Sequence, residues 1–264
     1  MSSENIISQL ADAIGSDALI TDFSEREYFS MDVFDIDQVA DLVFQPRSKN
    51  EISIALKILS ETDYQIIPRG GGMSYTGGYT PSTKRSVIVD TSLLNQILEI
   101  NPEDMYITVE AGCTWKSIYQ ALKPMGMRLP FFGTNSGSMA TVGGGLSNGA
   151  LFFGTGKYGS AADNVLGLEI IIADGTLIKT GQNAFANSKP HHRTYGPDMT
   201  GLFCHDAGSL GIKVQATFPL IFWPKSIDYL SFAYKTLEDS VAALSSVSKS
   251  GLTEECYVLD PSSA

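Results

Sequence analysis

Residues 130–181 constrain the fold of this chain more than any other segment. The first half is dense in Gly, Ser, Thr and Asn and almost free of charge. The second half, residues 165–180, alternates as an apolar β-ribbon with Asp174 and Gly175 at its tip. Glycine at this density costs chain entropy on ordering. A globular protein tolerates that cost where its backbone must approach another group closely, so residues 130–181 predict a binding surface followed by a β-hairpin.

A second glycine-rich segment lies upstream, at residues 68–78, and reads PRGGGMSYTGG. Backbone N–H groups without flanking side chains suit a phosphate-bearing ligand. Two such segments in one chain predict one large ligand held from two sides. The alternative interpretation is that these glycines serve only tight turns and close packing.

Composition bounds the class of protein. The 264 residues include 43 % hydrophobic residues, which is enough for a substantial core. The net charge of −11 argues against a nucleic-acid binder, since such a protein needs a basic footprint. The three cysteines form no CxxC pair, and the His191-His192 pair is too small for a metal site. We therefore expect no metal and a reducing, cytoplasmic compartment.

No leader or membrane span is expected from the sequence. The N-terminal segment lacks a basic start and a long apolar stretch. No segment has the length and apolarity of a transmembrane helix. Peripheral docking on a membrane stays open.

Alternating apolar patterns and capping residues predict a mixed α+β order. Ser48 is expected to cap a helix and Glu51 to complete a capping box with it. Thr114 is expected to cap a second helix. The expected helices are residues 4–14, 48–60, 114–123 and 197–203, and the expected strands are residues 42–44, 65–68, 87–90, 97–100, 106–110, 127–129 and 212–222.

A domain boundary is expected at Trp223-Pro224-Lys225. Beyond it the pattern predicts a strand at 229–234, a helix at 236–248 and a strand at 256–259. These three elements are too few to bury a core. The prediction is one domain over residues 1–223 and the incomplete beginning of a second over residues 224–264.

A GxGxxG pattern occurs at residues 154–159 and carries little weight. A dinucleotide-binding fingerprint needs a preceding strand and a following helix, whereas a strand is expected after Gly159. A P-loop is excluded because Lys157 is followed by Tyr158 instead of Ser or Thr.

Six blocks in order resemble the FAD-binding domain of the vanillyl-alcohol oxidase (PCMH) type, within its glycolate oxidase and D-lactate dehydrogenase branch. The blocks are residues 68–78, 130–149, 157–163, 165–181, 196–203 and 207–212. The resemblance implies an α+β fold: two α+β subdomains with FAD between them, followed by the start of a truncated α+β substrate (cap) domain.

The resemblance also implies a set of FAD-binding positions. Gly211 and Ile212 would present backbone to the polar edge of the isoalloxazine ring. The full implied set is Arg69, Gly70, Gly71, Gly72, Met73, Ser74, Thr76, Gly77, Gly78, Pro130, Gly133, Ser138, Thr141, Gly143, Gly144, Ser147, Asn148, Gly149, Tyr158, Gly159, Asp163, Val165, Gly211 and Ile212.

Two departures from the family pattern bear on the cofactor. Some relatives attach FAD through a His in the first loop, where this chain has Met73, and residues 130–160 contain no Cys. Non-covalent FAD is therefore expected. His205 stands where relatives usually carry Gly; a surface or packing role for it is favoured over a place near the flavin.

The function implied by the resemblance is that of a flavoprotein oxidoreductase, an FAD-linked dehydrogenase or oxidase moving hydride from a small 2-hydroxy acid such as D-lactate or glycolate. A small-molecule substrate and an electron acceptor (quinone, cytochrome, electron-transfer flavoprotein or oxygen) are expected, with the oligomeric state open. No catalytic residue is nominated, since the family places the base in the substrate domain. The alternatives are an alditol oxidase or alkylglycerone-phosphate synthase type, or an FAD-binding module that needs a missing C-terminal part for activity.

Overall fold

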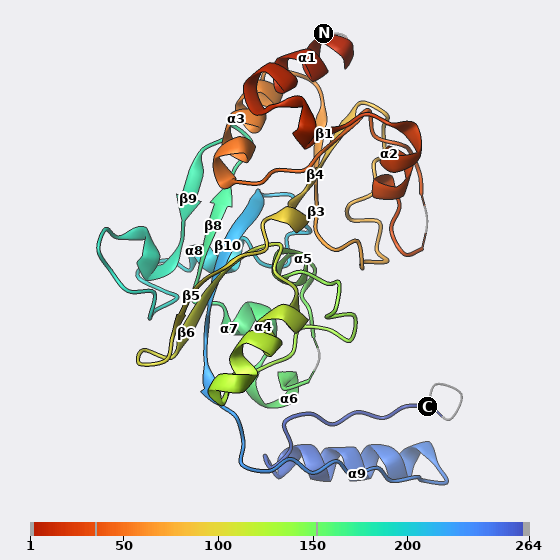
Figure 1. The fold of residues 1–264 in the computed structure, drawn as a ribbon. Helices are drawn as coiled ribbons and strands as arrows, with labels where there is room; N and C mark the ends of the chain where they lie inside the picture. Colours follow the sequence, from red (N-terminus) through yellow and green to blue (C-terminus); the bar gives the residue numbers. More distant parts are fainter. Residues whose placement is uncertain (1–2, 35, 152, 261–264) are drawn as a thin grey trace.

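The chain folds into two α+β subdomains and a C-terminal arm (Figure 1). The structure is a computed structural model that describes residues 3–34, 36–151 and 153–260. The first subdomain is built on a four-stranded sheet in the order β1-β2-β4-β3, in which β2, β4 and β3 run parallel and β1 antiparallel. Its elements are α1 (Ser3–Ile14), β1 (Leu19–Ile20), α2 (Phe23–Ser30), β2 (Leu42–Phe44), α3 (Lys49–Ser60), β3 (Gln65–Arg69) and β4 (Ser86–Asp90).

Helix α3 begins as the sequence predicts, with one difference in its cap. Ser48 Oγ accepts the Glu51 N–H at 3.2 Å. The Glu51 carboxylate accepts from the Arg47 N–H at 2.8 Å instead of from the Ser48 N–H. The predicted capping box is therefore displaced by one residue, because the extended backbone before the helix brings the Arg47 donor within reach.

The second subdomain is an antiparallel sheet in the order β5-β6-β10-β8-β9. Trp115, Phe131 and Phe218 meet edge to face in its core at centroid distances of 5.4–5.9 Å. The hairpin predicted over residues 165–180 is confirmed, and the predicted strands at residues 97–100 and 106–110 pair antiparallel with each other. Its elements are β5 (Ile97–Asn101), β6 (Tyr106–Glu110), α4 (Trp115–Leu122), β7 (Met127–Arg128), α5 (Val142–Asn148), α6 (Thr155–Tyr158), α7 (Ala161–Asn164), β8 (Gly167–Ile171), β9 (Leu177–Lys179), α8 (Met199–Leu202) and β10 (Ile212–Pro219).

A separate apolar core joins the two subdomains. Ile171, Ile212 and Val214 of the second sheet are buried together with Leu56 and Leu59 of α3. The Ser53 hydroxyl also donates to the Gly175 carbonyl at the hairpin tip. Burial of this apolar surface fixes the orientation of the two sheets, and with it the width of any site between them.

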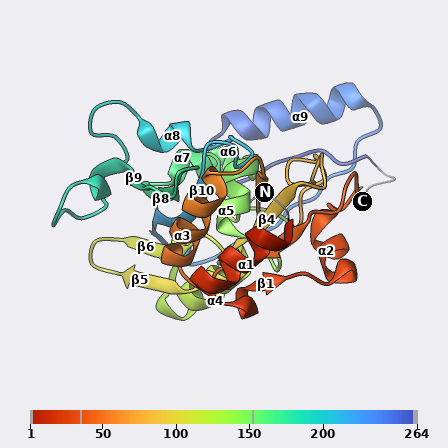
Figure 2. The ribbon, with the colours of Figure 1, turned by 90° about the horizontal axis from the view of Figure 1, so that it is seen from above.

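The C-terminal arm, the part of the chain that follows β10, lacks two of the strands predicted from the sequence. Strand β11 (Ile221–Phe222) pairs with β7, and α9 (Leu237–Lys249) forms as expected behind a Thr236 cap. Residues 229–234 and 256–259 form no strand. A strand needs a neighbour to pair its backbone groups, and the described residues of the arm offer none, so this backbone stays extended and solvated. In both Figure 1 and Figure 2, α9 lies at the periphery, away from the two sheets.

Candidate functional site

The two glycine-rich segments are in contact. A Cβ placed on Gly70 would lie 2.3 Å from Thr141 Oγ1 and 3.7 Å from Gly144 N. A Cβ placed on Gly71 would lie 1.9 Å from the Met139 carbonyl oxygen. No side chain fits at these positions without a shift of the neighbouring atoms, since real Cβ atoms essentially never lie within 3.0 Å of such atoms. Glycine is thus required for the two segments, about seventy positions apart in the chain, to meet.

The loop after β3 carries unpaired backbone donors. Within the described part of the chain, the N–H groups of residues 71–74 have no hydrogen-bond partner. Gly77 differs, since its N–H donates to Asp32 Oδ2 at 2.8 Å. The hydroxyls of Ser74 and Thr76 lie 2.9 Å apart at the outer end of the loop. A run of half-exposed N–H groups without carboxylate partners is an arrangement that binds anions.

Within the second glycine-rich segment, residues 142–148 form the helix α5. Thr141 caps α5, and its side chain accepts from Gly144 N at 3.4 Å. The Val142 N–H donates to the Cys113 carbonyl at 2.8 Å, and the Gly143 N–H donates to the Ala111 carbonyl at 2.7 Å. The first-turn donors of α5 are therefore used within the chain. This wall contributes close approach of backbone more than free N–H groups, which corrects the expectation that both walls donate.

Arg69 places a buried positive charge directly behind the first loop. The guanidinium lies against the rings of Tyr28, Phe29 and Tyr79, with its carbon 5.8, 5.0 and 5.6 Å from their centroids. Arg69 is 8 % exposed, and its nearest carboxylate, that of Asp90, is 4.0 Å away. Among the described residues, Arg69 Nε has no hydrogen-bond partner. The loop is thus backed by a cation that its own chain neutralises only in part.

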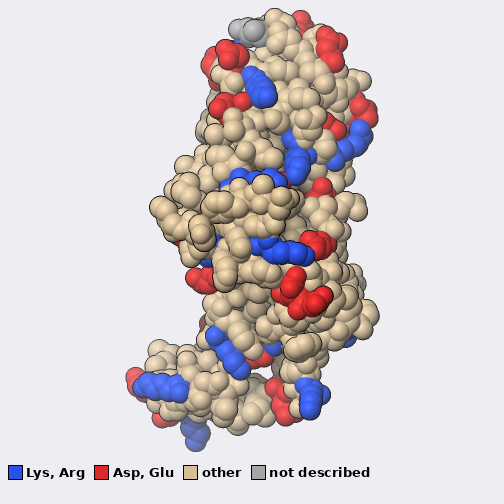
Figure 3. Space-filling model, turned by 90° about the vertical axis from the view of Figure 1, so that its left-hand side faces the viewer, with Lys and Arg blue, Asp and Glu red and all other residues tan. Residues whose placement is uncertain are grey.

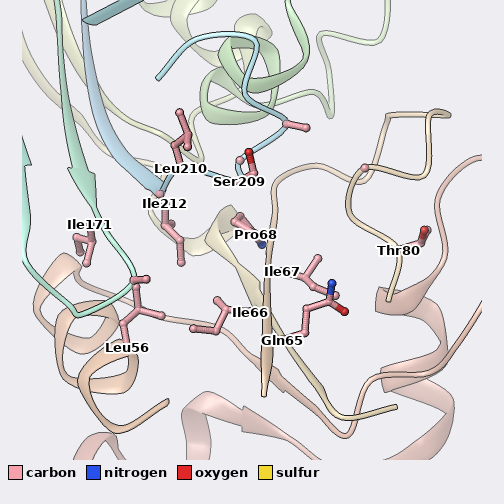
Figure 4. Close-up of a pocket in the computed structure, with 15 residues that line it drawn as sticks. Leu56, Gln65, Ile66, Ile67, Pro68, Thr80, Ile171, Ser209, Leu210 and Ile212 are labelled. Atoms are coloured by element: carbon pink, nitrogen blue, oxygen red, sulfur yellow. The ribbon is translucent and has the colours of Figure 1, made fainter. Parts of the chain in front are cut away.

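Two clefts open on either side of the first glycine loop. The Leu210 cleft, of about 290 Å³, lies between Pro68 and the loop at residues 207–212, where Figure 4 shows Ser209, Leu210 and Ile212 opposite Pro68 and Ile66. The Arg69 cleft, of about 510 Å³, lies between α2 and the segment before α5. Of the predicted residues, Gly78, Gly211 and Ile212 line the Leu210 cleft, and Arg69, Gly70, Gly71, Ser138 and Thr141 line the Arg69 cleft.

Several other predicted residues lie beside these clefts and have packing roles. Gly133 rests on the Trp115 indole, where an added Cβ would lie 2.1 Å from a ring carbon. Gly149 ends α5 with a left-handed φ of 68°. Gly72 adopts φ 66°, with the Arg69 guanidinium 2.2 Å from the position of an added Cβ. Pro130 and Val165 are buried in the structure, and Met73 is partly buried against the core of the second subdomain.

The predicted residues around α6 and α7 are engaged within the chain. Asp163 closes a capping box with Ser160, and these hydrogen bonds lower the pKa of the Asp163 carboxyl. The Tyr158 hydroxyl donates to Glu254 Oε1 at 3.3 Å, which joins this wall to the arm. Gly159 has φ 85°. Asn148 donates from its side chain to the Gly144 carbonyl at 3.2 Å, and the Ser147 carbonyl accepts the Ala207 N–H at 3.0 Å.

His205 is exposed and lies against Gly149, where its Nδ1 is 2.3 Å from the position of an added Cβ. It lines neither cleft. This placement agrees with the favoured prediction of a surface or packing role. Among the described residues, no three His, Cys, Asp or Glu side chains group as a metal site, and no helix is long and apolar enough to cross a membrane.

Two clusters were missed from the sequence. The aromatic residues around Arg69 come from α2 and from Tyr79, segments whose pattern gave only weak signals. The pair Asp206–Lys213 is buried at the base of the loop that lines the Leu210 cleft. No periodicity reveals such a pair, because its two members are joined by an irregular loop. On the face drawn in Figure 3, acidic and basic side chains are interspersed, without a continuous basic surface.

Comparison with known proteins agrees with this geometry. The sequence model of the family described as "FAD binding domain" matches residues 40–181. The glycolate oxidase subunit GlcD of Bacillus subtilis is 32 % identical over 78 % of this chain and 42 % of its own length. The mitochondrial D-lactate dehydrogenase [cytochrome] 1 of Saccharomyces cerevisiae is 29 % identical over 80 % of this chain and 35 % of its own length.

Solved structures confirm the fold. An alkyldihydroxyacetonephosphate synthase superposes with a TM-score of 0.81 at 20 % identity, covering 95 % of this chain and 46 % of its own. A p-cresol methylhydroxylase superposes with a TM-score of 0.72 at 20 % identity, covering 84 % of this chain and 44 % of its own. Fold and glycine-lined site together define a flavin-binding α+β domain of the PCMH type. The chain belongs to the FAD-binding-domain family, and it spans less than half the length of these relatives.

Proposed function

We propose that this chain binds one FAD without a covalent bond and serves the oxidation of a small 2-hydroxy acid of the D-lactate or glycolate kind. The observation that carries the proposal is the contact of Gly70 and Gly71 with residues 139–144, beside unpaired N–H groups and a buried arginine. The named activities of the D-lactate dehydrogenase and glycolate oxidase relatives support the choice of substrate class.

The residues around the first loop fit a diphosphate. The N–H groups of Gly71 and Gly72 are available to phosphate oxygens, and Arg69 supplies positive charge from behind. The hydroxyls of Ser74 and Thr76 extend the same donor surface. We assign the diphosphate of FAD to this loop. Backbone donors held by a folded scaffold bind an anion without paying for reorganisation at the moment of binding.

The loop at residues 207–212 is assigned to the flavin end. Gly211 and Ile212 line the Leu210 cleft, and an added Cβ on Gly211 would lie 2.6 Å from Ile170 Cγ2. When bound, FAD supplies the hydride acceptor for oxidation of the alcohol carbon. The chain's residues here position that ring and exclude water, with Leu210 and Ile212 as the apolar part of the wall.

The proposal leaves the base outside the two clefts. The carboxylate that lines the Arg69 cleft, Asp90, already accepts from Gln45 Nε2 and the Ser92 hydroxyl at 2.8 Å each. We therefore divide the chain into an FAD-binding domain over residues 1–223 and the first part of a substrate domain over residues 224–264. We assign the substrate base to none of the residues that line the two clefts. The electron acceptor is one of quinone, cytochrome, electron-transfer flavoprotein or oxygen, and the protein acts in the cytoplasm or at a membrane surface.

Absorption spectroscopy of the purified chain tests the proposal. We expect a yellow protein whose flavin passes to the supernatant on acid precipitation. Stopped-flow mixing with D-lactate or glycolate should bleach the flavin absorbance where the substrate domain is complete. A yellow protein that neither donor reduces supports the alternative, an FAD-holding module that needs a missing C-terminal part. A protein that takes up no added FAD contradicts the cofactor assignment.

A further inference from the structure

The loop between α8 and β10 holds a backbone conformation that needs support. His205, Ala207 and Gly208 have φ values of 57°, 50° and 77°, and two of the three are not glycine. Left-handed backbone at a residue with a side chain persists only when surrounding contacts over-determine it. The loop's N–H groups at His205 and Ala207 donate to the carbonyls of Leu146 and Ser147, which ties it to the end of α5.

A buried ion pair closes this loop. Lys213 Nζ lies 2.7 Å from Asp206 Oδ1, and both side chains are 2 % exposed. Asp206 Oδ1 also accepts the Gly208 N–H at 3.0 Å. Asp206 stands near the start of the loop and Lys213 directly after its end, so the pair clamps the two ends together. Among the described residues, the second oxygen, Asp206 Oδ2, is buried without a hydrogen-bond partner.

The clamped loop is one wall of the Leu210 cleft. Gly208 packs on the Pro68 ring, with an added Cβ 3.2 Å from Pro68 Cγ. Ser209, Leu210 and Ile212 line the cleft (Figure 4). Asp206 further fixes the wall because its carbonyl accepts both the N–H and the hydroxyl of Ser209, at 2.9 and 2.6 Å. The distance across the cleft is thus set by a loop that its own ion pair holds in shape.

We propose that Asp206 and Lys213 are positioning residues: their ion pair holds residues 207–212 in the conformation that the flavin end of the site requires. This inference rests on the proposed function of that wall as the flavin site. Burial lowers the pKa of the Lys213 ammonium, and the Asp206 hydrogen bond opposes that shift. Removing either partner leaves one buried charge uncompensated, next to the backbone of Gly211 and Ile212.

Single, double and conservative variants of the full chain test the proposal. Hydrogen exchange of residues 205–212 is measured first, on the FAD-free proteins. We expect Asp206→Asn and Lys213→Met to speed exchange in this loop by about tenfold or more, and Lys213→Arg to leave it near the parent value. Lys189→Met serves as the matched control, since its pair with Asp104 is 3.6 Å apart and Lys189 is 57 % exposed. Unchanged exchange in both single variants overturns the proposal whether or not FAD binds.

FAD titration and the flavin midpoint potential form the second arm. Each single variant should weaken FAD binding by about tenfold, and the double variant by less than the two effects added. Lys213→Met leaves a negative charge and should lower the midpoint potential, whereas Asp206→Asn leaves a positive charge and should raise it. If the variants unfold at lower temperatures but their flavin midpoint potentials stay at the parent value, the ion pair serves stability alone. That result would overturn the positioning claim. A parent chain that binds no FAD contradicts the proposed function and is read separately from the exchange result.

Discussion

Lys49 Nζ lies 2.6 Å from Glu169 Oε2, and this pair joins helix α3 of the first subdomain to strand β8 of the second. The other oxygen of Glu169 lies 2.8 Å from Lys179 Nζ on strand β9. Glu169 is 3 % exposed, whereas the two lysines are 49 % and 45 % exposed. A buried carboxylate with two partly solvated cations thus supports the interface between the two subdomains, beside the proposed FAD site.

The asymmetry in burial predicts unequal costs of substitution. Glu169→Gln removes the buried charge and leaves lysines that water can solvate, so it should lower the free energy of unfolding by about 1 kcal/mol. The double variant Lys49→Met with Lys179→Met leaves the buried carboxylate unpaired and should cost about 3 kcal/mol. Urea denaturation measures both. Arg47→Met, at the exposed pair with Asp17, is the control and should leave stability near the parent value. Equal losses in the free energy of unfolding for Glu169→Gln and for the double lysine variant would contradict this account of the buried carboxylate.

The same site predicts how stability depends on pH. Burial raises the pKa of Glu169, but the hydrogen bonds from Lys179 and Lys49 outweigh it and leave the pKa below its ordinary value. A carboxyl with a lowered pKa in the folded state stabilises above its unfolded pKa, about 4.3, and loses that contribution as the pH falls. The stability difference between parent and Glu169→Gln should therefore be full near pH 6 and shrink below about pH 4. A difference that grows on acidification would show that the sign is wrong.

The contact of the two glycine segments predicts a sharp steric result. Gly71→Ala would place a Cβ 1.9 Å from the Met139 carbonyl oxygen, and Gly70→Ala would place one 2.3 Å from Thr141 Oγ1. Each should separate the walls and weaken FAD binding by about a hundredfold, with a cost of about 2 kcal/mol in stability from overpacking. Gly78→Ala is the matched control for folding, since its nearest contact would be 3.6 Å away. FAD fluorescence titration measures the effect, and near-parental affinity of Gly71→Ala would contradict it.

Local patterns predicted most of the fold, because most elements here carry their own signals. Strands such as β4 are continuous apolar runs, and helices such as α3 and α4 have side-chain caps that the structure confirms. Helix α5 was not predicted from the sequence, because its residues, VGGGLSN, have poor helix propensity. It forms because Thr141 caps it and because Ala111 and Trp115 pack closely against Gly143 and Gly145. At Gly145 an added Cβ would lie 2.6 Å from the Trp115 ring, so no side chain fits there without a shift.

Two features of the structure depend on contacts between distant segments, so the sequence pattern alone did not predict them. The apolar runs at residues 229–234 and 256–259 have strand composition but no described neighbour to pair with, so they stay extended. Which glycine wall keeps open donors was also beyond a sequence pattern. The two glycine-rich segments are alike in composition. In α5, however, the N–H groups of Val142 and Gly143 donate to the carbonyls of Cys113 and Ala111, whereas the N–H groups of residues 71–74 have no hydrogen-bond partner among the described residues.

The aromatic box around Arg69 carries the last prediction. Arg69→Met removes the charge behind the diphosphate loop and should weaken FAD binding by about tenfold, with a shallower dependence of affinity on salt. Arg69→Lys keeps the charge but loses the planar contact with Tyr28, Phe29 and Tyr79. Its affinity for FAD should therefore lie between that of the parent and that of Arg69→Met. Arg69→Met should lose about 1–2 kcal/mol of stability from the lost cation–π contacts, and Arg69→Lys should lose less because its ammonium keeps part of them.

Arg85 provides a matched control, which distinguishes the effect of a charge beside the proposed FAD site from that of a charge elsewhere. Arg85 lies over the Tyr64 ring at 4.9 Å, lines neither cleft, and pairs with Asp63 at 2.5 Å. Arg85→Met removes the same charge and a similar ring contact, so its FAD affinity and salt dependence should match the parent. FAD titrations at two salt concentrations compare the variants. If Arg69→Met and Arg85→Met bind FAD alike, the positive charge behind the first loop does not act on the diphosphate, and the assignment of that loop falls with it.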